Sequence, residues 1–250
     1  MRTKYNDIEK YWCPIKKSVR SITISRTIWK IAKWIWSVLY KLLTFEIEFI
    51  QRQYTSMPVT ERHPLEPFLP QNARILMLGS FPPPKARWSM EFFYPNWIND
   101  MWRLMGYIFY GDKGHFEVKG EKRFDKEAVV EFCTTKGIAL YDTATEVNRL
   151  KDNASDKFLE VVTPTDISAL LAALPRCTAI VTTGEKATEV ITGTFGCEKP
   201  SVGSMTTFTA NERELHLWRM PSSSRAYPLS IERKALYYKA MLSAEIGGTE

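Results

Sequence analysis

The stretch Arg74-Ile-Leu-Met-Leu-Gly79 decides the fold of this chain of 250 residues. An apolar run ends there at a glycine, and the three prolines 82–84 follow, which is typical of a buried strand that runs into a loop. The same pattern recurs in residues 137–142, 177–184 and 214–220. The sequence therefore predicts four short buried strands.

Helical segments are expected between these strands, at residues 99–109, 126–136, 165–174, 185–191 and 231–242. Strands that alternate with helices favour a parallel sheet with helices on both faces. The predicted fold is α/β, a three-layer α/β/α sandwich around a central, mainly parallel four-stranded sheet. Ligands of such sheets bind beyond the carboxyl ends of the strands. The site is therefore expected in residues 79–84, 142–146, 184–186 and 220–227.

Composition excludes several protein classes. With 44% hydrophobic and 25% charged residues, the chain is neither disordered nor collagen-like nor a coiled coil. Its cysteines at 13, 133, 177 and 197 form no CxxC pair, so neither a zinc site nor a disulfide framework is indicated. We expect no metal and a reducing, cytoplasmic setting.

Positive charge is concentrated at the amino-terminal end. Residues 1–56 hold 11 Lys and Arg against 4 Asp and Glu, a net charge of +7. The totals of 34 and 28 leave 23 basic against 24 acidic residues in 57–250, a net charge of −1. An anionic partner of residues 57–250 must therefore be bound by local groups at a cleft.

The chain is expected to have two parts, a basic, Trp-rich extension at 1–56 and a domain at 57–250. Residues 29–50 are rich in Trp, Ile, Leu and Phe, but three lysines and two glutamates interrupt any membrane span of about 20 residues. Lysine mixed with Trp and Leu suits an interfacial helix on an anionic membrane surface. Two other interpretations stay open: an upstream stretch read from a misplaced start codon before Met57, or a packed part of the fold.

A serine-rich turn follows the last predicted strand. Ser222, Ser223 and Ser224 stand near a helix amino terminus, where hydroxyls and backbone N–H groups suit one phosphate, although serine is also an ordinary helix cap. Arg225 and Tyr227 supply a cation and an aromatic ring that would grip a DNA backbone or wedge into a base stack.

Residues 92–102 are rich in aromatic and amide side chains. A stacked heterocycle held by amide hydrogen bonds would use these residue types, and packing in the core would use the aromatic ones equally well. Asn99 and Asp142 are harder to explain by packing, although each suits a helix cap. The histidines, His63, His115 and His216, are expected at the surface or in the core.

Four blocks in order resemble the uracil-DNA glycosylase superfamily. They are Leu78-Gly-Ser-Phe-Pro82, Tyr94-Pro-x-x-x-Asn99-x-x-Trp102, Gly137-Ile-x-x-x-Asp142 and Met220-Pro-Ser-Ser-Ser224. The second and fourth blocks are similar to the mismatch-specific thymine/uracil branch. Asp142 and the apolar Phe81 of the first block are more like the hypoxanthine-DNA glycosylase branch. Together the blocks span about residues 70–240.

The resemblance implies a monofunctional DNA glycosylase of base excision repair, acting as a monomer without a cofactor. Such an enzyme flips a deaminated or mismatched base out of DNA and hydrolyses its N-glycosidic bond, leaving an abasic site. Uracil is the expected base, with hypoxanthine and mismatched thymine as alternatives. The implied roles are catalysis by Asn99, which would hold the water, and Asp142, which would read the base; base binding by Gly79, Ser80, Phe81, Phe93 and Tyr94; and DNA binding by Ser222, Ser223, Ser224, Arg225 and Tyr227.

Two positions depart from the family pattern. Phe81 stands where most uracil-excising enzymes similar to the mismatch branch have a water-positioning Asn. Met220 stands where the fastest uracil enzymes have a His that stabilises the departing base. A slower or narrower enzyme is expected, and the alternative is a catalytically inactive module with the same fold that binds damaged DNA.

Overall fold

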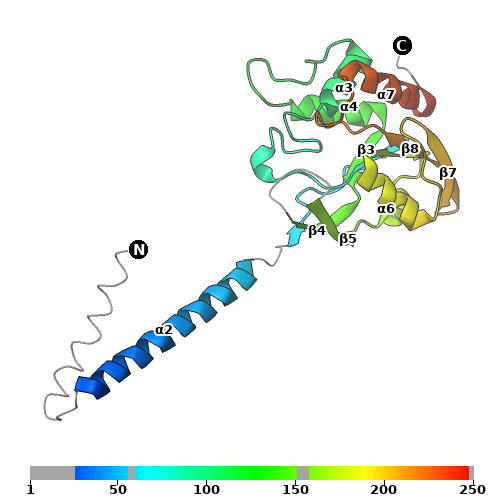
Figure 1. Cartoon of the computed structure of the whole chain (residues 1–250). Coiled ribbons are helices and arrows are strands. Elements are labelled where there is room, and N and C mark those ends of the chain that lie inside the picture. Colours follow the sequence, from blue (N-terminus) through cyan, green and yellow to red (C-terminus); the bar gives the residue numbers. More distant parts are fainter. Residues whose placement is uncertain (1–25, 56–59, 151–157, 248–250) are drawn as a thin grey trace. The chain divides into compact units, whose positions relative to one another are not determined.

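The structure is a computed structural model that describes residues 26–55, 60–150 and 158–247 (Figure 1). Contacts between residues divide the chain into two units, Met1–Met57 and Pro58–Glu250.

A five-stranded sheet forms the centre of the second unit. Its order is β3-β2-β6-β8-β7, with β2 at Ile75–Gly79, β3 at Ile138–Asp142, β6 at Ala179–Thr183 and β8 at Arg213–Met220. These four strands run parallel, and every residue of β2, β3 and β6 is buried. The four predicted strands are therefore confirmed.

The prediction of a four-stranded sheet was wrong, because a fifth strand lies at its edge. β7, Met205–Ala210, pairs antiparallel with β8. Its sequence is rich in Thr and alternates between exposed and buried residues, as an edge strand covered on one face does. Asn211 and Glu212 turn the chain with φ values of +49° and +60°, the left-handed conformation of a tight hairpin.

A second sheet was also missed. Three short antiparallel strands have the order β1-β4-β5, with β1 at Thr60–Arg62, β4 at Ala144–Arg149 and β5 at Leu159–Pro164. Four buried side chains form a small separate core with it: Phe81, Ala144, Val147 and Leu159. The strands of this sheet contain few apolar residues. A prediction from continuous apolar runs, which identifies the main strands, therefore does not find them.

Five α-helices and a short 3-10 helix, Lys85–Arg87, complete the described part of this unit. The α-helices are α3 at Met101–Tyr110, α4 at Lys126–Lys136, α5 at Ile167–Ala172, α6 at Glu185–Phe195 and α7 at Ile231–Glu245. Figure 1 shows α3, α4 and α7 gathered on one side of the main sheet and α6 on another. The layered α/β arrangement predicted from the alternation is therefore present.

The connections locate the point at which a ligand crevice forms. The chain passes from β2 to its neighbour β3 through α3 and α4, whereas it passes from β6 in the opposite direction across the sheet through α6 to β7 and β8. Right-handed crossovers in opposite directions place these helices on opposite faces of the sheet. The strand order therefore switches between β2 and β6, where open α/β sheets bind ligands.

The first unit contains one described helix, α2, Arg26–Thr55. Its large apolar side chains between residues 28 and 48 are exposed, including Trp34 at 68% and Phe45 at 69%. At 100° per residue, Lys30, Lys33 and Lys41 fall within one narrow polar stripe. Among the described residues, no helix is both long and apolar enough to cross a membrane.

Candidate functional site

The carboxyl ends of the parallel strands form a row at one edge of the main sheet. In strand order, the row runs from Asp142 through Gly79 and Thr183 to Met220. Three strand spacings make it roughly 14 Å long. Gly184 and Ser222, which follow β6 and β8, lie against each other, since a Cβ at Gly184 would meet Ser222 Cβ at 4.0 Å.

Asp142 lies in this row with its carboxylate over Gly79. A Cβ added to Gly79 would stand 2.3 Å from Asp142 Oδ1, so only glycine leaves room for the carboxylate there. Asp142 Oδ2 is 2.8 Å from His63 Nε2. The Asp142 side chain is 11% exposed, and a carboxylate held this way at a strand end is available to accept a hydrogen bond from a ligand.

His63 belongs to the site although the sequence analysis assigned it no role. Its side chain is 2% exposed. The backbone N–H of His63 donates to Thr145 O at 2.8 Å, which continues the pairing of β1 with β4, the strand that follows Asp142. That pairing is long-range, and no local pattern in residues 60–63 predicts it.

Phe81 and Phe93 lie beside this pair, but both are buried. Phe81 is 9% exposed and packs in the small core of the second sheet, and Phe93 is 4% exposed. Their ring centroids lie 5.4 and 6.2 Å from that of His63. The structure thus brings both predicted base-stacking rings to Asp142, and a base would have to displace or open this cluster to stack on them.

Tyr94 connects the second block to the switch point. Its hydroxyl is 3.0 Å from Thr183 Oγ1, and it lies close to Gly79. Burial and the charge of Asp142 raise the pKa of Tyr94, so its phenol is neutral. Tyr94 also has a φ of +50°. Left-handed backbone in a residue other than glycine costs about 1–3 kcal/mol and concentrates at functional sites. The half-buried Ser80 follows Gly79 in the same loop.

Asn99 lies at the other end of the row. Its Oδ1 accepts a hydrogen bond from Met101 N at 2.9 Å, which forms an Asx turn around Asp100, the N-cap residue of α3. Its backbone pairs with Ser224 in an isolated bridge. One lone pair of the amide oxygen is therefore engaged, and a water held by Asn99 would donate to the other lone pair or accept from Nδ2. The structure does not bring Asn99 into contact with Asp142.

Residues 222–227, the serine loop, are held in shape by hydrogen bonds to the loop's own serine hydroxyls. Ser222 Oγ accepts from Ser224 N and Ser224 Oγ accepts from Ala226 N, both at 3.2 Å. Ser223 is 2% exposed, and its carbonyl accepts from Asp100 N at 3.0 Å. The half-buried Tyr227 donates its N–H to Ser224 O at 3.1 Å. The fourth block is thereby fastened to the second.

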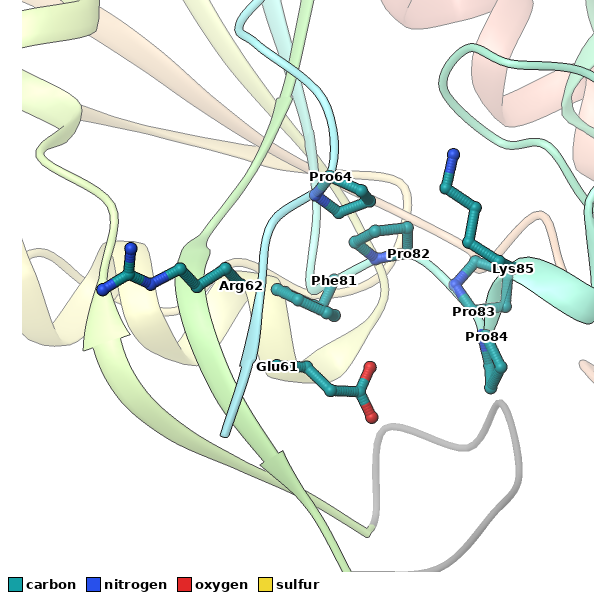
Figure 2. A pocket seen from close by; sticks show the side chains of 8 residues that line it. All are labelled: Glu61, Arg62, Pro64, Phe81, Pro82, Pro83, Pro84 and Lys85. Carbon is teal, nitrogen blue, oxygen red and sulfur yellow. The ribbon is translucent and has the colours of Figure 1, made fainter. Parts of the chain in front are cut away.

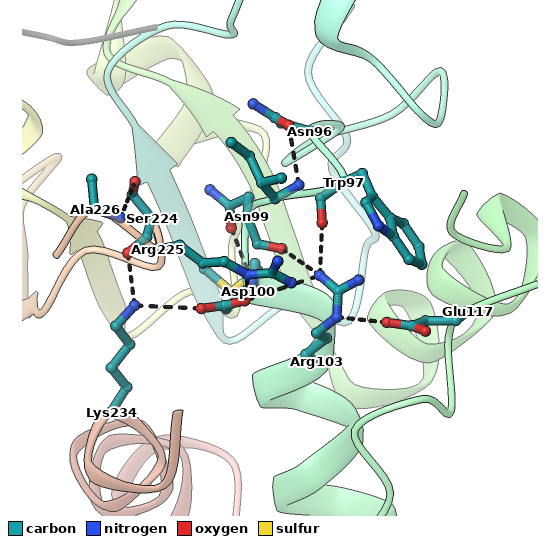
Figure 3. Close-up of polar contacts among 12 residues, drawn as sticks. Asn96, Trp97, Asn99, Asp100, Arg103, Glu117, Ser224, Arg225, Ala226 and Lys234 are labelled. Carbon is teal, nitrogen blue, oxygen red and sulfur yellow. Dashed lines mark hydrogen bonds and ion pairs between the residues drawn. The ribbon is translucent and has the colours of Figure 1, made fainter. Parts of the chain in front are cut away.

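An ion cluster supports this loop (Figure 3). Lys234 of α7, whose side chain is fully buried, donates to Ser224 O at 2.7 Å and lies 3.7 Å from Asp100 Oδ2. Arg225 Nε donates to Asp100 Oδ1 at 2.8 Å while its side chain stays 47% exposed. Arg103 donates to the carbonyls of Trp97 and Asn99, and its Nη1 lies 4.0 Å from Asp100 Oδ1. Asp100 therefore joins three cations at the start of α3.

A pocket of about 290 Å³ lies on another side of Phe81 (Figure 2). Glu61, Arg62 and Pro64 line it from β1 and the following loop, and the three prolines 82–84 line it with Lys85. Arg149 donates to both carboxylate oxygens of Glu61 and to Pro82 O, which fixes β1 against the loop after β2. Within residues 26–55, 60–150 and 158–247, no group of His, Cys, Asp or Glu side chains is placed to hold a metal ion.

The chain matches no protein-family model and none of the curated proteins. In fold it is similar to a solution NMR structure from Methanosarcina acetivorans, described as a "putative Uracil DNA glycosylase". The two share 21% sequence identity with a TM-score of 0.52, over 74% of this chain and 98% of the other. The second unit of this chain therefore has the fold of that structure.

Proposed function

We propose that the protein is a DNA glycosylase of base excision repair. It flips a deaminated or mismatched base, such as uracil, hypoxanthine or mismatched thymine, out of DNA and hydrolyses its N-glycosidic bond. The observation that carries the proposal is the Asp142 carboxylate, which lies over Gly79 beside aromatic rings at the carboxyl edge of the sheet. The proposal also includes action as a monomer in the cytoplasm, without a cofactor.

The chemistry of a carboxylate favours these bases. An ionised carboxylate only accepts hydrogen bonds. Uracil and thymine carry an N–H at N3 and hypoxanthine carries one at N1, whereas cytosine and adenine present a lone pair at these positions. Asp142 would therefore accept from a deaminated base and repel the base from which it arose.

Cleavage breaks the bond between C1′ of the sugar and the base nitrogen. The bonding electron pair leaves with the base, a water oxygen forms the new bond to C1′, and the water's proton ends on the departing base or on solvent. Groups that favour positive charge on the sugar and negative charge on the base lower the barrier. In this proposal Asn99 holds the water, and the neutral Tyr94 hydroxyl lies near the base.

The loop after β8 would hold the DNA strand. The serine loop lies at the amino-terminal side of α7, and Ser222 and Ser224 offer hydroxyls there. Arg225, half-exposed beside Asp100, would contact a flanking phosphate, and Tyr227 would fill the gap left by the flipped base. The contacts of the serines and Arg225 would be made to the DNA backbone, and such contacts position the protein on DNA and carry no sequence information.

A single-turnover assay of the full chain tests the proposal. Duplex and single-stranded oligonucleotides would carry uracil opposite A or G, thymine opposite G, or hypoxanthine, and alkaline cleavage would reveal abasic sites. We expect release of at least one of these bases at a rate that saturates with enzyme. Release of none of them by folded, DNA-binding protein would contradict the proposal.

A second candidate function is that of an inactive module that recognises damaged DNA. It is favoured by Phe81 and Met220, which are buried at 9% and 1% exposure and offer no polar group to water or to the departing base. Tighter binding to damaged than to undamaged duplex, without base release, would establish it.

We also propose that α2 binds an anionic membrane surface. Its lysine stripe would contact the anionic headgroups, and its exposed Trp, Leu and Phe side chains would enter the boundary between headgroups and acyl chains. The full chain should sediment with vesicles of phosphatidylglycerol and not with vesicles of phosphatidylcholine alone, and Lys30→Glu combined with Lys33→Glu should abolish this. Equal binding to both vesicle types would contradict the electrostatic part of the proposal.

A further inference from the structure

We infer that His63 is a positioning residue that fixes which oxygen of Asp142 faces the extruded base. The inference rests on the proposed function. It concerns a residue outside the four blocks, brought to the site by the pairing of β1 with β4.

The His63 ring is fixed on every side that the structure describes. Nε2 lies 2.8 Å from Asp142 Oδ2, and Nδ1 lies 2.8 Å from Leu65 O and 3.2 Å from Leu65 N. The Tyr141 ring centroid lies 4.6 Å from the His63 centroid, with the rings of Phe81 and Phe93 close by. The ring therefore has a partner at both nitrogens and little room to rotate.

The hydrogen bond with His63 occupies one oxygen of the Asp142 carboxylate. If Leu65 N–H donates to Nδ1, the ring proton is on Nε2 and points at Asp142 Oδ2. If Nδ1 instead donates to Leu65 O, a proton again lies between Nε2 and Oδ2, because two unprotonated acceptors would repel each other. Oδ2 is engaged in either case, and Oδ1 is held over Gly79.

Fixing one carboxylate oxygen of Asp142 toward the base makes the enzyme more selective among bases. With Oδ2 held by His63, Oδ1 is the oxygen positioned to accept from the one ring N–H of uracil or hypoxanthine. A carboxylate free to turn could also present an oxygen to the exocyclic amino group of cytosine or adenine, which is a hydrogen-bond donor. Loss of His63 should therefore slow excision and also weaken discrimination against undamaged bases.

Three variants of the full chain test this. His63→Ala should lower the single-turnover rate about 10–100-fold, comparable to the loss of a residue that orients a metal ligand, while the half-saturating enzyme concentration stays unchanged. His63→Gln places an amide donor near the position of Nε2 and should recover most of the rate. His63→Asn places its donor near Nδ1, toward Leu65, and should not. The ratio of uracil to cytosine excision should fall in His63→Ala.

The outcomes separate the inference from the proposed function. An active wild type with a fully active His63→Ala variant, or with equal losses in the Gln and Asn variants, overturns the inference alone. A wild type that releases no base overturns the proposed enzyme. The same variants are then compared for preference between uracil-containing and undamaged duplex, which should vanish in His63→Ala and persist in His63→Gln. A preference that is absent from the wild type, or equal in all variants, overturns the role of His63 there.

Discussion

Replacing Asp142 with alanine should lower the single-turnover rate of base excision about 10²–10³-fold, the usual effect of losing one preorganised polar group at a reacting centre. The carboxylate is the polar group that the structure places over Gly79, and its removal takes away the proposed acceptor of the base N–H. The rate should be measured at saturating enzyme with the best substrate found for the wild type.

Asn99→Ala tests the second proposed catalytic residue and should also abolish excision. Because the Asn99 side chain accepts from Met101 N at the start of α3, thermal unfolding must be followed in parallel to show that the fold is intact. A suitable control is Glu91→Gln, which changes an exposed carboxylate that is paired with Lys85. If Asp142→Ala and Asn99→Ala both keep the wild-type rate, the site lies elsewhere.

Replacing Asp100 with asparagine should lower the free energy of unfolding by about 3–5 kcal/mol, because it leaves a buried cation without its counter-ion. The side chain of Lys234 is fully buried, and Asp100 is its only anionic partner among the described residues. Chemical denaturation at neutral pH measures the loss. Glu91→Gln, which breaks an exposed ion pair, should cost at most about 1 kcal/mol.

The same variant should show a characteristic dependence on pH. Burial lowers the pKa of Lys234, and Asp100 opposes that shift. Without Asp100 the pKa falls further, so between it and the ordinary value of 10.5 the unfolded chain binds more protons than the folded one. The deficit in stability should therefore shrink as the pH rises toward 10.5. Addition of Lys234→Met should restore part of the stability at pH 7, and a deficit independent of pH would contradict the assignment.

The main sheet could be predicted because the sequence signals that mark its strands and helices lie within each segment. Each parallel strand is a short apolar run that ends at a turn, and α4 is capped by Asp125 at its start and by Gly137, which has a φ of +69°, at its end. β7 and the second sheet could not be predicted in this way. Their strands are short and polar on one face, and their pairing joins residues as distant as Thr60 and Asn148.

The residues of the candidate site fall into the same two groups, those with a local sequence signal and those placed by long-range pairing. Gly79, Tyr94, Asp142 and the serine loop could be predicted, since each follows a strand or belongs to one of the four blocks. His63 could not, because its place beside Asp142 depends on the pairing of β1 with β4. The burial of Phe81 was missed for a related reason: its neighbours Ala144, Val147 and Leu159 belong to the sheet that the sequence analysis passed over.

The central claim is that Asp142 accepts a hydrogen bond from the ring N–H of the extruded base. The most direct measurement removes that N–H from the substrate, by comparing duplexes that carry uracil or N3-methyluracil, or hypoxanthine and 1-methylhypoxanthine if that base is preferred. With wild-type protein the methyl group should cost about 10²-fold or more in single-turnover rate, and with Asp142→Ala it should cost far less. An equal penalty in both proteins, or none in the wild type, would show that Asp142 does not read the base.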